Sequence, residues 1–574
     1  MGDLLRATTR SRVLALFVLS AVCAACERFL PPSASIPRGV LAQAVCHPSD
    51  SAAPTSIALV VLAYNRVPAL SAALDSVARC ATCADAFDAV FVSIDGGSTK
   101  VASILRRVGS GGRHAALVSG TWVCERGSVR VGTEATSSAR AASSPVNADA
   151  RTNIARHYAC ALDRVFARGF QYAVLLEDDM VVGSDFGALF ASTRHLLRNA
   201  EKYSVLCVSA WNDNGMRHLV HPSVRHALFR TSFFPGLGWM LSRDLWLSEL
   251  SEKWPDGVHA NASTGWDHWL RLPAQMQGRD CIAPVVPRAR NMGNTGANVR
   301  KQEFDAVLAT LAFVDELDDE LRDNRDACES AAVWVPDSKL EYLEPRQYMR
   351  HIQQEIDSAT RIGSLVQLSE LRTCRTLQNA SMVDLASGTL SGRCTPTAET
   401  ISSSPRSFLY IYKRERFVED VADPLGIFPQ PRSIYKGVQV IFFSEAPHIT
   451  LYLADARVCP FLRPEEQLHP SPQAQLFAAR RGESCDAACA SIRKNCSASE
   501  LEFANTCEQL ERFFDCPSGC GLETGPDLPA AVEADAVELA TRGQCLVTYG
   551  GYPDGRALTC SGSFRHTRRL CACV

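Results

Sequence analysis

The chain has 574 residues, more than one domain normally holds, so the sequence predicts two or three domains. Its net charge of −3 and its pI near 6.5 argue against a nucleic-acid-binding surface, which is strongly basic. The chain carries 23 cysteines, and 11 of them lie after Val458. This density is typical of proteins in an oxidising compartment and predicts a C-terminal module held by disulfides.

The N-terminus predicts the route of the protein through the cell. Three arginines precede an apolar run from Val13 to Cys26, so residues 1–30 are read as a signal-anchor or a cleaved signal peptide. Because the charges lie before the run, an anchor would leave the N-terminus in the cytosol and the body of the protein in the lumen. Residues 31–55 are rich in Pro, Ser and Ala and are predicted to form a stem or linker.

The body of the chain opens with a pattern of strand, helix and strand. Ile57–Ala63 is a continuous apolar run that ends near Arg66, and Ala89–Ile94 is a second apolar run that ends at Asp95. Helical spacing between them makes this a βαβ nucleotide-binding pattern, although neither G-x-G-x-x-G nor a P-loop is present. Arg66 suits a phosphate or base contact but could be a surface charge. Asp95 could equally form a turn, because two glycines follow it.

The stretch Gln171–Met180 carries the strongest chemical signal. A buried strand from Tyr172 to Leu176 is predicted to end in three adjacent carboxylates, Glu177-Asp178-Asp179. Acids at the carboxyl end of such a strand lie where open α/β sheets bind ligands, and three neighbouring anions need a counter-cation. Oxygen ligands favour Mg²⁺ or Mn²⁺ together with substrate phosphates. The alternative is an acidic N-cap that opens a helix from Val181 onward.

Two further segments hold candidate side chains. Asn153–Phe166 has the spacing of an amphipathic helix, and His157 is expected beside its apolar face. Trp266-Asp267-His268-Trp269 places an acid between two tryptophans. Indole faces stack on sugar rings, and a low-polarity surrounding keeps an acid reactive. The alternative is a pair of core tryptophans beside an acid that caps a helix.

Several of these segments resemble one known family. The matching stretches are ARHY (155–158), LEDDM (176–180), CVSAWNDNG (207–215), FFPGLGWML (233–241), WDHW (266–269) and GRDC (278–281). Together they are similar to the β-1,2-N-acetylglucosaminyltransferase I family and, more distantly, to the protein O-mannose N-acetylglucosaminyltransferases. The resemblance covers roughly residues 56 to 455. It implies a GT-A-type nucleotide-sugar-binding mixed sheet with helices on both faces over residues 56–300 and a small second domain over residues 301–455.

The resemblance also implies roles on the donor side of the site. Asp179 matches the acid that ligates Mn²⁺ of the metal–UDP complex. The remaining matches are UDP contacts at Arg66, Asp95 and His157 and contacts to the donor sugar and ribose at Glu177 and Asp178. The expected donor is therefore UDP-GlcNAc, with Mn²⁺ as cofactor.

On the acceptor side, Asp267 matches the acid segment of the family, and we expect it to be the catalytic base. Well-known members have a second acid where this chain has His268, so His268 remains the alternative base. A disulfide between Cys207 and Cys281 is implied in the same way, because both partners of that family bridge are present. Closure of the stretch 291–300 after Cys281 is expected to exclude water.

Residues 456–574 form the predicted cysteine-rich module. Disulfides are favoured over zinc, because paired C-x-x-C motifs and histidine ligands are lacking and the compartment is oxidising. The 11 cysteines leave one thiol without a partner inside the module. GESCDAAC, LTCSGS and RRLCACV resemble the cysteine-rich C-terminus of N-acetylglucosaminyltransferase V, so we interpret the module as an accessory that could bind the glycoprotein acceptor or a partner.

The expected function is inverting transfer of N-acetylglucosamine from UDP-GlcNAc to the 2-hydroxyl of a terminal mannose of an N-glycan core. The expected place is the Golgi lumen, with a single-pass type II attachment to the membrane. Two alternatives remain open: the same transfer onto protein O-linked mannose, and a non-catalytic glycan-binding protein on the same fold.

Overall fold

The computed structural model describes residues 56–108, 112–126, 150–221, 224–256, 265–292, 308–317, 339–365, 406–444, 449–523, 525–536, 541–548 and 558–574. The predicted signal segment and stem lie outside these residues, as does most of the stretch 291–300. No helix within the described ranges has the length and apolar character needed to cross a membrane.

The largest element is an eight-stranded mixed sheet of order β3-β2-β1-β4-β8-β6-β9-β7. Its strands are β1 Ile57–Ala63, β2 Ala89–Asp95, β3 Gly120–Cys124, β4 Tyr172–Glu177, β6 Val205–Ser209, β7 Leu228–Thr231, β8 Trp239–Ser242 and β9 Asp280–Pro284. Strands β3, β2, β1 and β4 run parallel, and β8 enters antiparallel between β4 and β6. The predicted βαβ start is therefore present.

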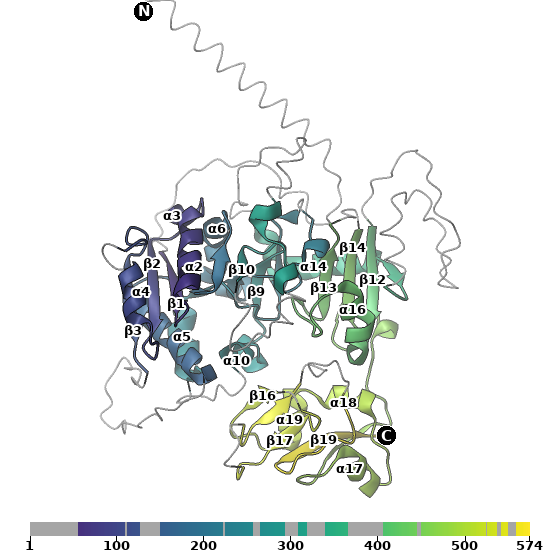
Figure 1. The fold of residues 1–574 in the computed structure, drawn as a ribbon. Coiled ribbons are helices and arrows are strands. Elements are labelled where there is room, and N and C mark those ends of the chain that lie inside the picture. Colours follow the sequence, from purple (N-terminus) through teal and green to yellow (C-terminus); the bar gives the residue numbers. More distant parts are fainter. Residues whose placement is uncertain are drawn as a thin grey trace, which may run out of the picture.

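Helices cover both faces of this sheet (Figure 1). They are α2 Val67–Arg79, α3 Cys83–Ala86, α4 Val101–Val108, α5 Ala150–Ala167, α6 Phe186–Arg198, α7 Ala200–Tyr203, α8 Arg243–Leu245, α9 Ser251–Lys253, α10 Trp266–Leu270 and α11 Pro273–Met276. Alternate residues of β1 enter two different cores: Leu59 packs in the core with α2 and α6, and Val60 packs in the core with α5. This period of two, with every residue of β1 buried, explains the continuous apolar run in the sequence.

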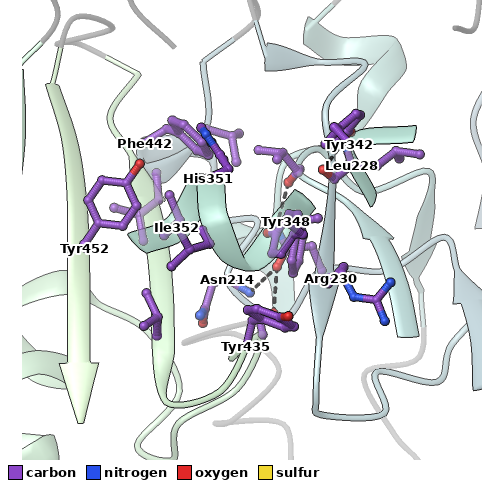
Figure 2. A pocket seen from close by; sticks show the side chains of 18 residues that line it. Asn214, Leu228, Arg230, Tyr342, Tyr348, His351, Ile352, Tyr435, Phe442 and Tyr452 are labelled. Carbon is purple, nitrogen blue, oxygen red and sulfur yellow. Dashed lines mark hydrogen bonds between the residues drawn. The ribbon is translucent and has the colours of Figure 1, made fainter. Parts of the chain in front are cut away.

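A four-stranded sheet of order β11-β12-β14-β13 lies beyond β9 in Figure 1. Its strands are β11 Thr360–Ile362, β12 Arg406–Tyr412, β13 Val438–Phe442 and β14 Ile449–Asp455, accompanied by the helices α14 Pro345–Ser358 and α16 Asp423–Leu425. A cavity of about 60 Å³ lies where the two sheets meet, lined by tyrosines such as Tyr348 and Tyr435 (Figure 2). None of the predicted site residues lines this cavity.

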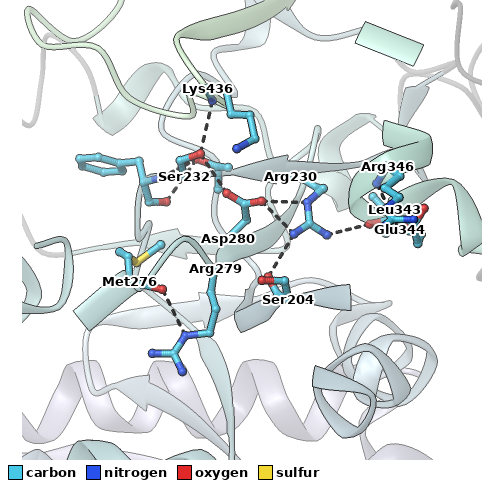
Figure 3. Close-up of polar contacts among 12 residues, drawn as sticks. Ser204, Arg230, Ser232, Met276, Arg279, Asp280, Leu343, Glu344, Arg346 and Lys436 are labelled. Carbon is cyan, nitrogen blue, oxygen red and sulfur yellow. Dashed lines mark hydrogen bonds and ion pairs between the residues drawn. The ribbon is translucent and has the colours of Figure 1, made fainter. Parts of the chain in front are cut away.

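A buried ion pair in the large sheet is hydrogen-bonded to the second part of the chain (Figure 3). Arg230 of β7 is 2.8 Å from the Asp280 carboxylate of β9, and it donates to the Leu343 carbonyl at 2.7 Å. Ser232 donates to the other oxygen of Asp280 at 2.9 Å and accepts from the Lys436 backbone N–H. Each charged group is therefore satisfied inside the protein, which is the condition for burying it.

The C-terminal module is a five-stranded sheet of order β15-β19-β17-β18-β16 with three helices. These elements are β15 Gln475–Ala478, α17 Cys485–Ser491, α18 Ala498–Ala504, α19 Cys507–Phe513, β16 Cys520–Leu522, β17 Ala530–Val532, β18 Cys545–Val547 and β19 Thr567–Cys573. Its five disulfides are Cys485–Cys571, Cys489–Cys573, Cys496–Cys560, Cys507–Cys520 and Cys516–Cys545. The disulfide-rich module is thus confirmed, and the odd cysteine is Cys459, a buried free thiol.

Candidate active site

The candidate site lies at the carboxyl ends of three neighbouring strands. Strand β1 lies between β2 and β4 and is parallel to both, so the chain segments that follow these strands meet at one edge of the sheet. Arg66 follows β1, Asp95 ends β2, and Glu177 ends β4. Residues far apart in sequence are brought together in this way.

Arg66 bridges two of the three acids. Its guanidinium lies 2.7 Å from Asp178 and 2.6 Å from Asp179, and the Tyr64 backbone N–H donates to the second oxygen of Asp178 at 3.0 Å. The side chain of Asp178 is 2 % exposed, and burial raises the pKa of its carboxyl although the Arg66 charge opposes the rise. Arg66 is therefore bound to the acids at the strand end and is not an isolated surface charge.

Asp179 has the character of a ligand for a hard cation. Its Oδ1 is buried and has no hydrogen-bond partner, while Oδ2 accepts from Arg66. A buried carboxylate oxygen without a donor is costly, and a divalent ion such as Mg²⁺ or Mn²⁺ would satisfy it. The set of carboxylate oxygens at this strand end therefore fits an oxygen-preferring metal.

The chain after the acids forms a strand and not a helix. Met180–Val182 is β5, which pairs antiparallel with β10, Ala289–Asn291, and α6 begins only at Phe186. The alternative of a helix opening at Val181 is thus wrong, because main-chain pairing with a distant segment determines the conformation here. The Met292 N–H also donates to the Asp179 carbonyl at 2.8 Å, which fixes the start of the stretch 291–300 against the acids.

Glu177 is paired with a side chain that the sequence pattern did not single out. The Tyr158 hydroxyl on α5 donates to Glu177 Oε1 at 2.8 Å. Burial, followed by the nearby charge of Asp179, raises the pKa of the Glu177 carboxyl to about 7, and the Tyr158 hydrogen bond works against that rise. The motif ARHY contained this tyrosine, but only the fold showed its partner.

Asp95 lies at the end of β2 and His157 lies beside this strand, which is the neighbour of β1 on the side away from β4. Arg126 binds both carboxylate oxygens of Asp95, at 2.9 and 3.0 Å, and was not singled out from the sequence, since it lies in a polar loop. His157 is buried, with Nε2 2.9 Å from the Ser93 hydroxyl on β2. Burial lowers the pKa of His157 to about 4, so the ring is neutral at physiological pH.

The acid of WDHW lies on α10. Gly265 precedes the helix at φ 105°, and a Cβ at this position would lie 2.8 Å from the Asp267 carboxylate, so glycine is required. Arg271 pairs with Asp267 at 3.0 Å. Burial would raise the pKa of the Asp267 carboxyl, but the charges of Arg271 and His268 and the backbone N–H donors hold it below its ordinary value. Asp267 is therefore ionised at neutral pH.

His268 differs from Asp267 in its charge state. Burial lowers the pKa of His268 to about 4, so it is also neutral at physiological pH. Arg432, from the loop before β13, contributes to this lowering; it is fixed by an ion pair with Asp213 at 3.0 Å and lies 4.0 Å from the Phe428 ring centroid. A residue distant in sequence thus adds a cation beside α10.

The tryptophans of WDHW pack in the core and do not form an open platform for a sugar. Trp266 and Trp269 are each 8 % exposed. Trp266 stacks on Trp239 and Trp254, with ring centroids 5.8 Å apart in both pairs. The expected sugar-stacking role is therefore not supported. Trp266 also packs on the Tyr158 ring, with ring centroids 4.1 Å apart, which links α10 to the acidic strand end.

Cys207 of β6 and Cys281 of β9 are joined by a disulfide across neighbouring parallel strands. The part of the chain that forms the eight-stranded sheet has two further disulfides that were not expected from the sequence, Cys80–Cys83 and Cys124–Cys160. The second of these ties β3 to α5 beside His157.

The mixed sheet, its two helical layers and the acids at its strand ends define a GT-A-type fold. The model of the GNT-I family matches residues 35–379. The chain belongs to this family. A curated relative, the alpha-1,3-mannosyl-glycoprotein 2-beta-N-acetylglucosaminyltransferase of Arabidopsis thaliana, is 40 % identical over 163 residues, which are 28 % of this chain and 34 % of the relative. The match thus spans about a third of the relative's length.

Solved structures show more remote likenesses. The S. aureus TarS 1–349 complex with UDP is 12 % identical, with a TM-score of 0.25 over 40 % of this chain and 57 % of that chain. The mannosyltransferase PcManGT from Pyrobaculum calidifontis, in complex with GDP-Man and Mn²⁺, is 15 % identical, with a TM-score of 0.26 over 55 % of this chain and 78 % of that chain.

Proposed function

We propose that this protein transfers N-acetylglucosamine from UDP-GlcNAc to the 2-hydroxyl of a terminal mannose of an N-glycan core, with inversion at the anomeric carbon. The observation that carries the proposal is the position of Tyr158. Its hydroxyl binds Glu177 and its ring packs on Trp266, so the donor acids and the acid of α10 belong to one site. Membership of the GNT-I family supports the choice of sugar and acceptor.

The donor half of the reaction belongs to the acids after β4 and to Arg66. Asp179 would hold Mn²⁺ through its unpartnered Oδ1, and the bound ion would supply positive charge to the departing diphosphate. Arg66 is a second cation at the same place, fixed by Asp178 and Asp179. Asp95 and the neutral His157 match positions that the resemblance assigns to UDP contacts.

The acceptor half of the reaction belongs to α10. Asp267 is ionised at neutral pH, so it can take the proton of the mannose 2-hydroxyl while that oxygen bonds to the anomeric carbon. The bond from the anomeric carbon to the diphosphate breaks in the same in-line step, and UDP leaves. Inversion needs one base and no covalent intermediate. His268 remains the alternative base, because its ring is also unprotonated at neutral pH, and the resemblance favours Asp267.

The test is an acceptor panel with the full chain, UDP-GlcNAc and Mn²⁺. An oligomannose N-glycan, an O-mannosyl peptide and a control without acceptor separate the two transfer reactions and simple hydrolysis of the donor. Transfer to the N-glycan that chelation abolishes, and that Asp179→Ala lacks, supports the proposal. Transfer to the peptide alone would move the proposal to O-linked mannose, and binding of glycan without turnover would favour a glycan-binding protein.

We further propose a Golgi address with type II membrane attachment through the segment 1–30, which rests on the sequence pattern alone. Fluorescence of a tagged full chain beside a Golgi marker tests the address. Protection of a C-terminal tag from protease in intact vesicles tests the lumenal orientation. Accessibility of that tag without detergent would contradict it.

A further inference from the structure

The cysteine-rich module contacts the helix that bears the proposed base. Some Cα atoms of β16, the edge strand of the module sheet, lie within 8 Å of Cα atoms of α10. The two elements are neighbours in Figure 1. Gly521 in the middle of β16 is buried. Val547 of the neighbouring strand β18 packs against the hydrophobic cluster that contains Trp266 and Trp269. Two strands of the module thus lie against the acceptor side of the site.

A second contact holds the module on the four-stranded sheet. Arg457, directly after β14, pairs with Glu415 at 2.6 Å and lies 3.9 Å from Glu502 on α18 of the module. The Arg457 guanidinium also lies 5.2 Å from the ring centroid of Phe503. The side chains of Arg457 and Glu502 are 5 % and 1 % exposed, so this charge contact is buried.

The two contacts have different partners. The Arg457 contact joins the module to the four-stranded sheet, whereas the β16 contact joins it to α10 of the large sheet. The module therefore spans both parts of the chain on the side of α10. An acceptor that brings its mannose to Asp267 must approach α10, which is the helix that β16 contacts.

We propose that the β16 edge of the module forms one wall of the acceptor site and selects acceptors by the portion that extends beyond the reactive mannose. This inference rests on the proposed function. A monosaccharide acceptor fills the site near Asp267 without reaching the wall, whereas the arms of a branched glycan on a glycoprotein lie against it. The wall thus changes the KM of large acceptors and leaves the chemical step unchanged.

The experiment compares the full chain with Val547→Asp, which places a charge against the tryptophan cluster, and with the milder Val547→Ala. The matched control is Gln475→Asp on β15, an exposed position at the opposite edge of the module sheet. Each protein is assayed with methyl α-mannoside, with a branched glycoprotein and without acceptor. We expect Val547→Asp to change KM for the glycoprotein about fivefold, with a smaller change for Val547→Ala. KM for methyl α-mannoside, kcat and donor hydrolysis should stay within about twofold.

Equal changes for both acceptors, or a loss of kcat alone, would overturn the inference, since they would show that Val547 only supports α10. No change in the glycoprotein KM of either Val547 variant would also overturn it. The proposed function is tested separately with the unaltered chain. If that chain transfers to neither acceptor, the proposed function is wrong and the inference is wrong with it. If Val547→Asp does not fold, Val547→Ala tests the inference through the ratio of KM for the glycoprotein to KM for methyl α-mannoside.

Discussion

The charge of Arg271 controls the proposed base, and its removal should change the pH dependence of transfer. Arg271 lies 3.0 Å from Asp267, and the two side chains are 9 % and 35 % exposed. Its guanidinium is the leading attraction that holds the pKa of the Asp267 carboxyl below its ordinary value against the effect of burial. Replacing Arg271 with Gln removes this charge, so the pKa of Asp267 should rise.

The size of the effect follows from the geometry of the pair. Two unit charges about 4 Å apart attract by about 4 kcal/mol at the effective dielectric constant of a protein surface, whereas exposed pairs contribute less than about 1 kcal/mol. Because a third of the Asp267 side chain is exposed, the attraction lies between these limits, at about 1.4 kcal/mol. Loss of this attraction changes the acid dissociation constant of Asp267 by a factor of about ten. A carboxyl acts as a base only when it is ionised, so the transfer rate should fall at pH values below the pKa of Asp267.

The assay is the pH profile of kcat/KM for the mannose acceptor, which reports the ionisation of the free enzyme. Below the acid midpoint, Arg271→Gln should be about tenfold slower than the unaltered chain, and the two curves should converge at alkaline pH. Arg271→Lys retains the charge and should keep most of the acid limb. An unchanged acid limb in Arg271→Gln would show that Asp267 is not the group that titrates.

Three further predictions follow from the geometry. Asp179→Asn should lower Mn²⁺-dependent transfer at least about 100-fold, whereas Asp244→Asn, an exposed acid on α8, should leave the rate unchanged in the same assay. His268→Asn should cost less than about tenfold in kcat at neutral pH, because Asp267 takes the proton in the proposed step; a loss of about 100-fold or more would make His268 the base. Arg230→Met should lower stability by about 3–5 kcal/mol in urea unfolding, because it leaves the Asp280 charge buried and unpaired. The double variant with Asp280→Leu should recover part of that loss, and strictly additive losses would contradict the pairing.

Local patterns determined the elements that carry the site. The apolar run of Ile57–Ala63 and the alternation of its residues between two cores follow from the period of a strand, and the acids after Leu176 mark a strand end. The density of cysteines after Val458 was enough to predict a disulfide module. Each of these signals depends on residues close in sequence, where backbone geometry limits the possible structures.

The contacts that make a site out of these elements depend on residues far apart in sequence. Arg66 meets Asp179 across 113 positions, and nothing local distinguishes such an arginine from a surface charge. Trp266 became a core residue because Tyr158 and other aromatic rings cover it, which no spacing in WDHW reveals. Cysteines alone do not determine which thiols pair, and composition does not place the module beside α10. Only the packing of the whole chain decided these points, because each depends on which surfaces meet when the sheets assemble.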